Sequence, residues 1–181
     1  MKSILALTLL SLLSFPAIAQ HGDHTNHQPE QHQHTDHLET LILHYMEAKN
    51  ALVQDKFESA KEHILQFSEE VNSSGEMNKH DEHAEKHADH HAKMKAAVQE
   101  ASESEDITAL RSAFKKISDE LITAVQNQGF EGTLFKQYCP MYKGGSSWLS
   151  LEDEVQNPFY GQAMHSCGGS SELLNEDSDG R

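Results

Sequence analysis

The sequence is poor in cationic residues, in cysteine and in long apolar runs. Lys and Arg together number 14 against 29 Asp and Glu, which gives a formal net charge of −15. Such an acidic chain repels phosphate backbones and attracts cations, so we expect no nucleic acid partner. A bilayer span needs about 20 apolar residues, and no stretch beyond the N-terminal region has that character. The remaining chain is therefore expected not to cross a membrane.

Motifs of several enzyme classes are also missing. The sequence has no paired Glu-x-x-His motifs for a di-iron bundle and no Cys-x-x-Cys-His for a c-type haem. It has neither a serine-nucleophile motif nor a phosphate-binding loop. We therefore predict a protein that is not an enzyme and that acts by binding.

The N-terminal segment is typical of a secretory signal. Lys2 precedes an apolar run over residues 4–15, Pro16 ends the run, and small residues follow at 17 and 19. Cleavage is expected after Ala19, so that residues 1–19 form a signal peptide. We predict a periplasmic protein, with an extracellular location as the alternative.

A histidine-rich segment over residues 20–37 has no apolar residue to bury before Leu38 and is predicted to be disordered. Apolar residues spaced three and four apart then predict four amphipathic helices, at about 36–54, 56–72, 78–101 and 106–128. Gly129 stands where a helix C-cap is expected.

The predicted fold class is all-α. An antiparallel up-down four-helix bundle is expected over residues 38–128, because the connections between the helices are short. An irregular cap in the same domain is expected over 129–169, in which 133–138 is a candidate short strand, and residues 170–181 are expected to be a disordered acidic tail.

The third predicted helix carries five histidines within a sector of about 100°. Imidazoles three or four residues apart can share one ion of Zn(II), Cu(II) or Ni(II). The candidate ligands in this helix are His80, His83, His87 and His91. Two other interpretations stay open: the histidines fill the seam of the bundle, or they sense pH near neutrality. His44 and His63 are isolated in the sequence and are interpreted as structural or surface residues.

A second candidate site lies in the cap and contains both cysteines of the chain. Two thiols and two thioethers form a soft ligand set that selects Cu(I), or Ag(I) as its mimic. The residues are Cys139, Met141, Met164 and Cys167, with His165 as an additional nitrogen ligand. Zinc fits less well, since it requires four nitrogen or sulfur ligands. The alternative is a structural or interaction domain, in which the two cysteines form a disulfide and the methionines fill the core.

Four motifs in order give the chain a resemblance to a known family. They are Tyr138-Cys139-Pro140-Met141, Trp148-Leu149-Ser150, Asn157-Pro158-Phe159-Tyr160-Gly161 and Met164-His165-Ser166-Cys167-Gly168. A helical motif, Arg111, Phe114, Ser118 and Leu121, precedes them. Over residues 38–169 the chain resembles a periplasmic domain-of-unknown-function family. That domain is found alone or fused to copper/silver efflux adaptor proteins of the membrane-fusion (CusB-like) type.

The resemblance implies a role in copper or heavy-metal handling outside the cytoplasm. It carries over Cys139, Met141, Met164 and Cys167 as ligand positions, and an efflux adaptor or pump as a partner. The histidine load exceeds what the family leads us to expect. We therefore predict a Cu(I)/Ag(I) buffer or chaperone linked to efflux or resistance, with the histidines as an auxiliary pool for Cu(II), Zn(II) or Ni(II).

Overall fold

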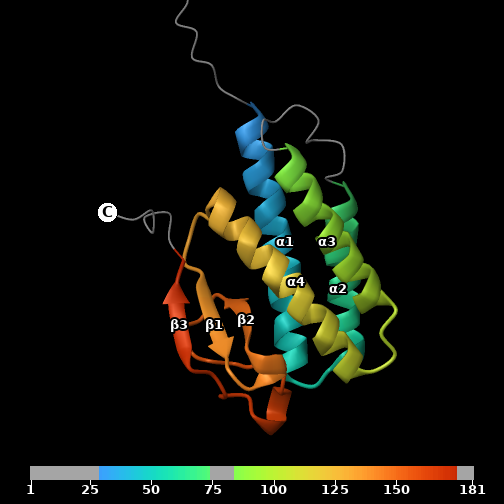
Figure 1. The fold of residues 1–181 in the computed structure, drawn as a ribbon, viewed down its shortest axis with the longest axis vertical. Helices are drawn as coiled ribbons and strands as arrows, with labels where there is room; N and C mark the ends of the chain where they lie inside the picture. Colours follow the sequence, from blue (N-terminus) through green and yellow to red (C-terminus); the bar gives the residue numbers. More distant parts are fainter. Residues whose placement is uncertain (1–28, 74–83, 175–181) are drawn as a thin grey trace, which may run out of the picture.

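The computed structural model describes residues 29–73 and 84–174, which form four helices followed by a small sheet. The helices are α1 (Pro29–Val53), α2 (Phe57–Ser73), α3 (Ala84–Ser102) and α4 (Ile107–Gln128). They run alternately down and up beside one another (Figure 1). In this part of the chain no helix has both the length and the hydropathy that crossing a membrane requires.

The helix ends follow the capping signals of the sequence. The side chain of Asp106 accepts hydrogen bonds from two backbone N–H groups of the first turn of α4. Gly129 ends the same helix with φ of 78° and donates its N–H to the carbonyl of Val125, as predicted. α1 begins at Pro29, earlier than the expected start at 36, and proline suits the first turn because it lacks an N–H. The predicted signal peptide and residues 20–28, 78–83 and 175–181 lie outside the described residues.

Apolar residues at helical spacing bury one face of each helix. In α2 the buried residues recur every three or four positions, at Ala60, Ile64, Phe67 and Val71. Burial of one large apolar side chain stabilises a fold by about 1.5–3 kcal/mol. The helical part of the core is therefore explained by the pattern that predicted the helices.

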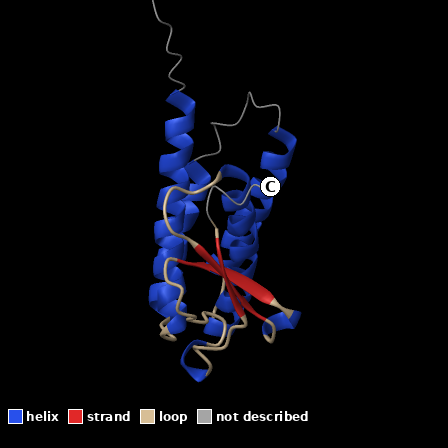
Figure 2. Ribbon diagram, turned by 90° about the vertical axis from the view of Figure 1, so that its left-hand side faces the viewer, coloured by secondary structure: helices blue, strands red, loops and turns tan. Residues whose placement is uncertain are grey.

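The predicted all-α class is wrong, because the expected irregular cap contains a three-stranded antiparallel sheet. Its strands are β1 (Phe135–Cys139), β2 (Ser146–Ser150) and β3 (Ser170–Leu173), in the order β2-β1-β3. Two short 3-10 helices, η2 (Tyr142–Gly144) and η3 (Gly161–Ala163), lie in the connections. Figure 2 shows the sheet lying across the helices. β3 uses residues that were expected to belong to the acidic tail.

The sequence does not predict the whole of β1, because the inward-facing side chains of this strand are not aliphatic. Gln137 and Cys139 are both fully buried, so no alternation of apolar and polar residues marks the strand. The Gln137 amide donates to three successive backbone carbonyls, those of residues 152–154, at 3.0–3.1 Å. A buried polar residue with these partners replaces the apolar residue that the pattern requires.

Aromatic side chains join the sheet to the bundle. The Tyr45 ring stacks on Phe114 at 4.8 Å between centroids, and Phe114 contacts Phe159 at 6.3 Å. Phe159 meets the edge of Trp148 at 5.7 Å. The Tyr45 hydroxyl hydrogen-bonds with Ser118 at 2.8 Å and accepts the N–H of Leu149 in β2 at 3.1 Å. The sheet and helices therefore share one core, which also accounts for Phe114 and Ser118 in the helical motif.

A polar junction fixes the other end of the cap to the bundle. Arg111 of α4 donates to the carboxylate of Asp55 at 2.5 Å and to the carbonyls of Leu52 and Pro158 at 2.8 Å. This guanidinium holds the pKa of Asp55 below its usual value, mainly through the hydrogen bond. Gly161 has φ of 55° and lies so close that a Cβ there would collide with the Asp55 carboxylate and the Arg111 guanidinium. The positive φ and this close approach therefore favour glycine over any other residue at this position.

Candidate metal centre

Three sulfur atoms meet beside the lower end of β1. The two thiols, Cys139 Sγ and Cys167 Sγ, lie 3.7 Å apart, and Cys167 Sγ lies 3.6 Å from Met141 Sδ. Both cysteines are free thiols, since a covalent S–S bond would be about 2.05 Å long. The structure therefore brings together three of the four sulfur residues predicted from the sequence.

Strand β1 and the turn after it place two of these residues. Cys139 is the last residue of β1, pairs with Ser146 of β2 and has 0% exposure. The chain then turns at Pro140. Met141 directly precedes η2 and is 60% exposed to solvent. The site therefore has one ligand inside the core and one at the surface.

Backbone hydrogen bonds place Cys167 against the same strand. The N–H of Gly169 donates to the carbonyl of Tyr138 at 2.9 Å, directly beside Cys139 in the chain. The buried Asn157 side chain donates from Nδ2 to the carbonyl of Cys167 at 2.6 Å. A Cβ at Gly168 would lie 2.5 Å from a methyl of Val155, which is too close for any other residue without a shift. These contacts explain why the Met-x-x-Cys-Gly motif follows an Asn-Pro motif.

The hydrogen bond between the thiols changes the acidity of the outer one. The bond to Cys139, followed by burial, raises the pKa of the Cys167 thiol. The Cys167 thiol is thus a weaker acid because Cys139 lies beside it. A soft cation between the sulfurs would remove this penalty, because it replaces the protons and favours both thiolates.

Met164 and His165 are not part of the sulfur cluster. Met164 is exposed, and its thioether makes no hydrogen bond to either thiol among the described residues. His165 lines a separate cavity of about 600 Å³ between α1 and the segment that follows β2. Lys49 lies at the wall of that cavity with 3% exposure, and burial lowers its pKa to about 8. These two predicted ligand positions are therefore not supported by the arrangement in the structure.

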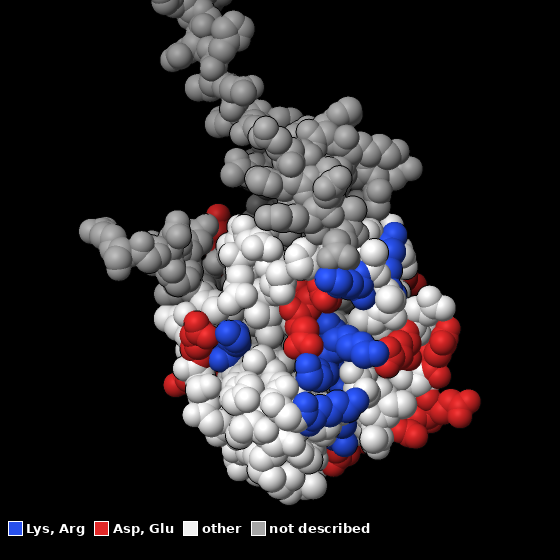
Figure 3. Space-filling view, in the orientation of Figure 1, with Lys and Arg blue, Asp and Glu red and all other residues white. Residues whose placement is uncertain are grey.

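The surface around the sulfur cluster is apolar and carries little charge. Tyr138, Met141 and Met164 are among the exposed large hydrophobic residues. Figure 3 shows that charged side chains gather over the helices, whereas the lower sheet and the loops beneath it form a largely uncharged surface.

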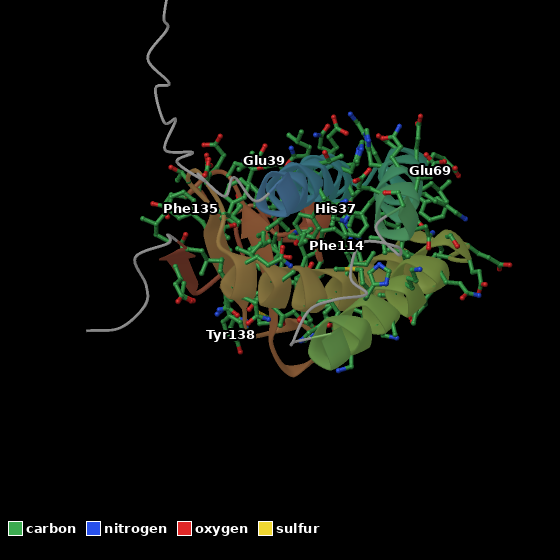
Figure 4. The ribbon with its side chains drawn as sticks, turned by 90° about the horizontal axis from the view of Figure 1, so that it is seen from above. His37, Glu39, Glu69, Phe114, Phe135 and Tyr138 are labelled. Atoms are coloured by element: carbon green, nitrogen blue, oxygen red, sulfur yellow. The ribbon has the colours of Figure 1, made fainter. Side chains whose placement is uncertain are left out.

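Three described histidines, His37, His90 and His91, join neighbouring helices. His37 Nδ1 lies 2.5 Å from Glu70 of α2, and His90 Nδ1 lies 2.9 Å from Glu120 of α4. Figure 4 shows His37 on the inner side of α1. His91 Nε2 donates to the carbonyl of Val71 at 2.9 Å. His90 and His91 therefore lie in the seams between helices, the first of the alternative interpretations.

The remaining histidine predictions have different outcomes. His80 and His83 lie outside the described residues, and His87 belongs to α3 but its side chain is not described. His44 and His63 are not isolated from each other in space, because both face Glu47 Oε2, at 3.8 and 3.0 Å. Among the side chains that the structure describes, those of residues 37–73 and 90–174, no three His, Cys, Asp or Glu are placed to hold a metal ion.

The described residues thus define a four-helix bundle that carries a three-stranded sheet with two thiols and a thioether at its lower end. The chain belongs to the family described as Protein of unknown function (DUF3347), which matches residues 41–132. The expected membership of a domain-of-unknown-function family is confirmed. The matched region covers most of the bundle and ends before β1, so the sulfur residues lie beyond it. No curated protein and no solved structure matches the chain.

Proposed function

We propose that this protein binds Cu(I), or Ag(I) in its place, through the thiolates of Cys139 and Cys167 and the thioether of Met141. It acts as a buffer or chaperone for the ion outside the cytoplasm and catalyses no reaction. The observation that carries the proposal is that these three sulfur atoms lie in contact, although they are up to 28 residues apart in the sequence.

The sulfur distances suit a shared ion. With metal–thiolate bonds of about 2.3 Å, two sulfur ligands lie about 3.8 Å apart around a tetrahedral ion and about 4.0 Å apart around a trigonal one. In the structure the Cys139–Cys167 and Cys167–Met141 sulfur separations are 3.7 and 3.6 Å. An ion can therefore enter between the sulfurs with shifts of a few tenths of an ångström.

The ligand types favour a soft monovalent ion over zinc. Thiolate and thioether ligands select Cu(I), whereas Zn(II) prefers four thiolate, imidazole or carboxylate ligands. Met141 supplies a neutral thioether and His165 lies on another cavity, so within the described part of the chain no fourth ligand suited to zinc contacts the cluster. Two thiolates and one thioether match a three-coordinate Cu(I) site.

The exposure of the ligands favours exchange over permanent storage. Met141 is 60% exposed and Cys139 is fully buried, so the site opens to the surface at its weakest ligand. A partner with sulfur ligands can replace Met141 first and withdraw the ion without unfolding the sheet. This accords with a buffer or a chaperone that serves an efflux adaptor or pump in metal resistance.

Two further parts of the proposal depend on the sequence. The signal at residues 1–19 directs export to the periplasm. The histidines of residues 20–37 and of the third helix form an auxiliary pool of lower affinity for Cu(II), Zn(II) or Ni(II). The engaged positions of His37, His90 and His91 limit this pool, because an ion there has to displace hydrogen bonds between helices.

The test is a Cu(I) titration against a chromophoric chelator with fully reduced protein that starts at Gln20. The double variant Cys139→Ser/Cys167→Ser should lose at least about 1,000-fold in affinity, and Met141→Leu about tenfold, or about 1.4 kcal/mol. Met164→Leu is the matched control, since it removes a neighbouring exposed thioether outside the cluster. Undiminished Cu(I) affinity in the double cysteine variant would overturn the proposal.

A further inference from the structure

The two thiols of the proposed site are also the only two cysteines of the chain. They differ in access to solvent: Cys139 has no exposed surface, whereas Cys167 is half-buried. Their sulfur atoms are in direct contact at 3.7 Å. An oxidant that arrives from solvent therefore meets Cys167 first and finds a second thiol within reach of it.

We propose that the Cys139–Cys167 pair is a redox gate on the metal site, closed by small-molecule disulfides and held open by bound metal. This inference rests on the proposed function and names its regulation. The reduced pair binds the ion, and the oxidised pair cannot, because both thiolate ligands are consumed in one covalent bond.

The closing reaction is a thiol–disulfide exchange in two steps. The Cys167 thiolate attacks one sulfur of the oxidant RS–SR, a Cys167–S–SR mixed disulfide forms, and RS⁻ leaves. The Cys139 thiolate then attacks Cys167 Sγ and expels the second RS⁻. In sum, two protein thiols and one RS–SR give one protein disulfide and two RSH, so the two electrons pass to the small molecule.

The surrounding contacts favour the second step over a lasting mixed disulfide. Cys139 is held at the end of β1 by strand pairing. Cys167 is held by the hydrogen bond from Asn157 to its carbonyl, and the nearby N–H of Gly169 bonds to β1. Both sulfurs therefore stay in contact while the mixed disulfide exists. A group attached to Cys167 also has space, because Cys167 contacts Met141 on the side of the site that is exposed to solvent.

The closed gate leaves too little to hold an ion. Of the three sulfur ligands, only the Met141 thioether remains, and a single neutral ligand at 60% exposure competes poorly with water and buffer. The converse also follows. An ion bound to both thiolates occupies the electron pairs that would attack the oxidant, so the metal-loaded protein should resist oxidation.

The test exposes the reduced chain that starts at Gln20 to oxidised glutathione and follows it by intact mass and free-thiol count. We expect loss of two hydrogens with no lasting glutathione adduct, and Cu(I) affinity at least about 100-fold lower, recovered on reduction. Protein loaded with Ag(I) should react at least about tenfold more slowly. In single variants, Cys139→Ser should keep one glutathione on Cys167, while Cys167→Ser should react far more slowly at the buried Cys139.

The outcomes separate this inference from the proposed function. If the reduced protein shows no cysteine-dependent Cu(I) binding but forms the disulfide, the proposed function fails and the pair is a structural disulfide. If the reduced protein binds Cu(I) but accumulates stable glutathione adducts, or retains its affinity when oxidised, the redox gate is refuted while the metal site stands. Far-UV circular dichroism confirms that each variant is folded.

Discussion

Replacement of Asn157 by Asp tests whether the loop that carries Cys167 is held in place for metal binding. Asn157 is fully buried, and its Nδ2 donates to the carbonyl of Cys167 at 2.6 Å. Its Oδ1 accepts the N–H of Phe159 at 2.8 Å. Asn157→Asp keeps the acceptor for Phe159 but turns the donor into an oxygen that faces the Cys167 carbonyl. No metal ligand is changed.

The size of the effect follows from the lost hydrogen bond. A buried carbonyl left without its donor costs about 1–3 kcal/mol, and the buried carboxylate adds to that cost. If metal binding has to restore the position of the Cys167 loop, the same 1–3 kcal/mol reduces the affinity for Cu(I) by about 5- to 150-fold. The thiols themselves are still present, so the free-thiol count should stay at the wild-type value.

Two measurements check this expectation. The first is the Cu(I) competition titration, and the second is the rate at which a thiol reagent modifies the buried Cys139, which should rise in Asn157→Asp. Gln156→Glu is the matched control, because it adds the same charge at the adjacent position, whose side chain lines the separate cavity and, within the described residues, makes no hydrogen bond to the Cys167 loop or the thiols. Wild-type affinity and wild-type Cys139 protection in a folded Asn157→Asp protein would refute the positioning role.

Three other predictions concern the cap, the buried lysine and the histidine segment. Gly161→Ala should lower the free energy of unfolding by about 2–4 kcal/mol in urea, because Ala combines an unfavourable positive φ with a collision at the Asp55–Arg111 pair; an unchanged midpoint would contradict the close packing. Lys49 has its pKa lowered to about 8 by burial. The folded state then binds fewer protons than the unfolded state from about pH 8 to about pH 10.5, and stability should rise there by up to about 3 kcal/mol. Lys49→Met should remove that rise and be more stable than the wild type near pH 7. Denaturation of both proteins at about pH 7 and at about pH 10.5 would show this. Deletion of residues 20–28, which leaves α1 intact, should reduce the number of Cu(II) ions bound in a titration and leave the affinity for Cu(I) unchanged; equal loss of both would place the tight site in the deleted segment.

The four helices could be predicted because their apolar residues recur every three or four positions, a spacing that indicates an amphipathic helix. In α4 the apolar positions recur at helical spacing, and Asp106 and Gly129 mark the two ends. The sheet could not be predicted in the same way. β1 faces the core with Gln137 and Cys139, and β3 is exposed along its whole length, so neither strand shows an alternating pattern. Pairing with neighbours distant in the chain, and not local preference, makes these residues strands.

The sulfur site was predicted in part for a related reason. Soft residue types in one segment indicated a common site, and Cys139, Met141 and Cys167 do meet. Which thioether takes part depends on a backbone contact that sequence does not reveal, namely the bond from Gly169 to Tyr138 beside the end of β1. Met164 lies at the surface and His165 on another cavity.

The order of the sheet bears on when the site can form during synthesis. β3 is the last described strand, and it pairs with β1 from Phe135 to Tyr138, immediately before Cys139. A nascent chain that has not yet released residues 170–173 already contains both thiols but lacks the pairing that closes their loop. A molecule in which residues 170–173 have not yet paired with β1 therefore carries both thiols before their contact is fixed, and under the proposed function it would hold the ion only after β3 has joined the sheet.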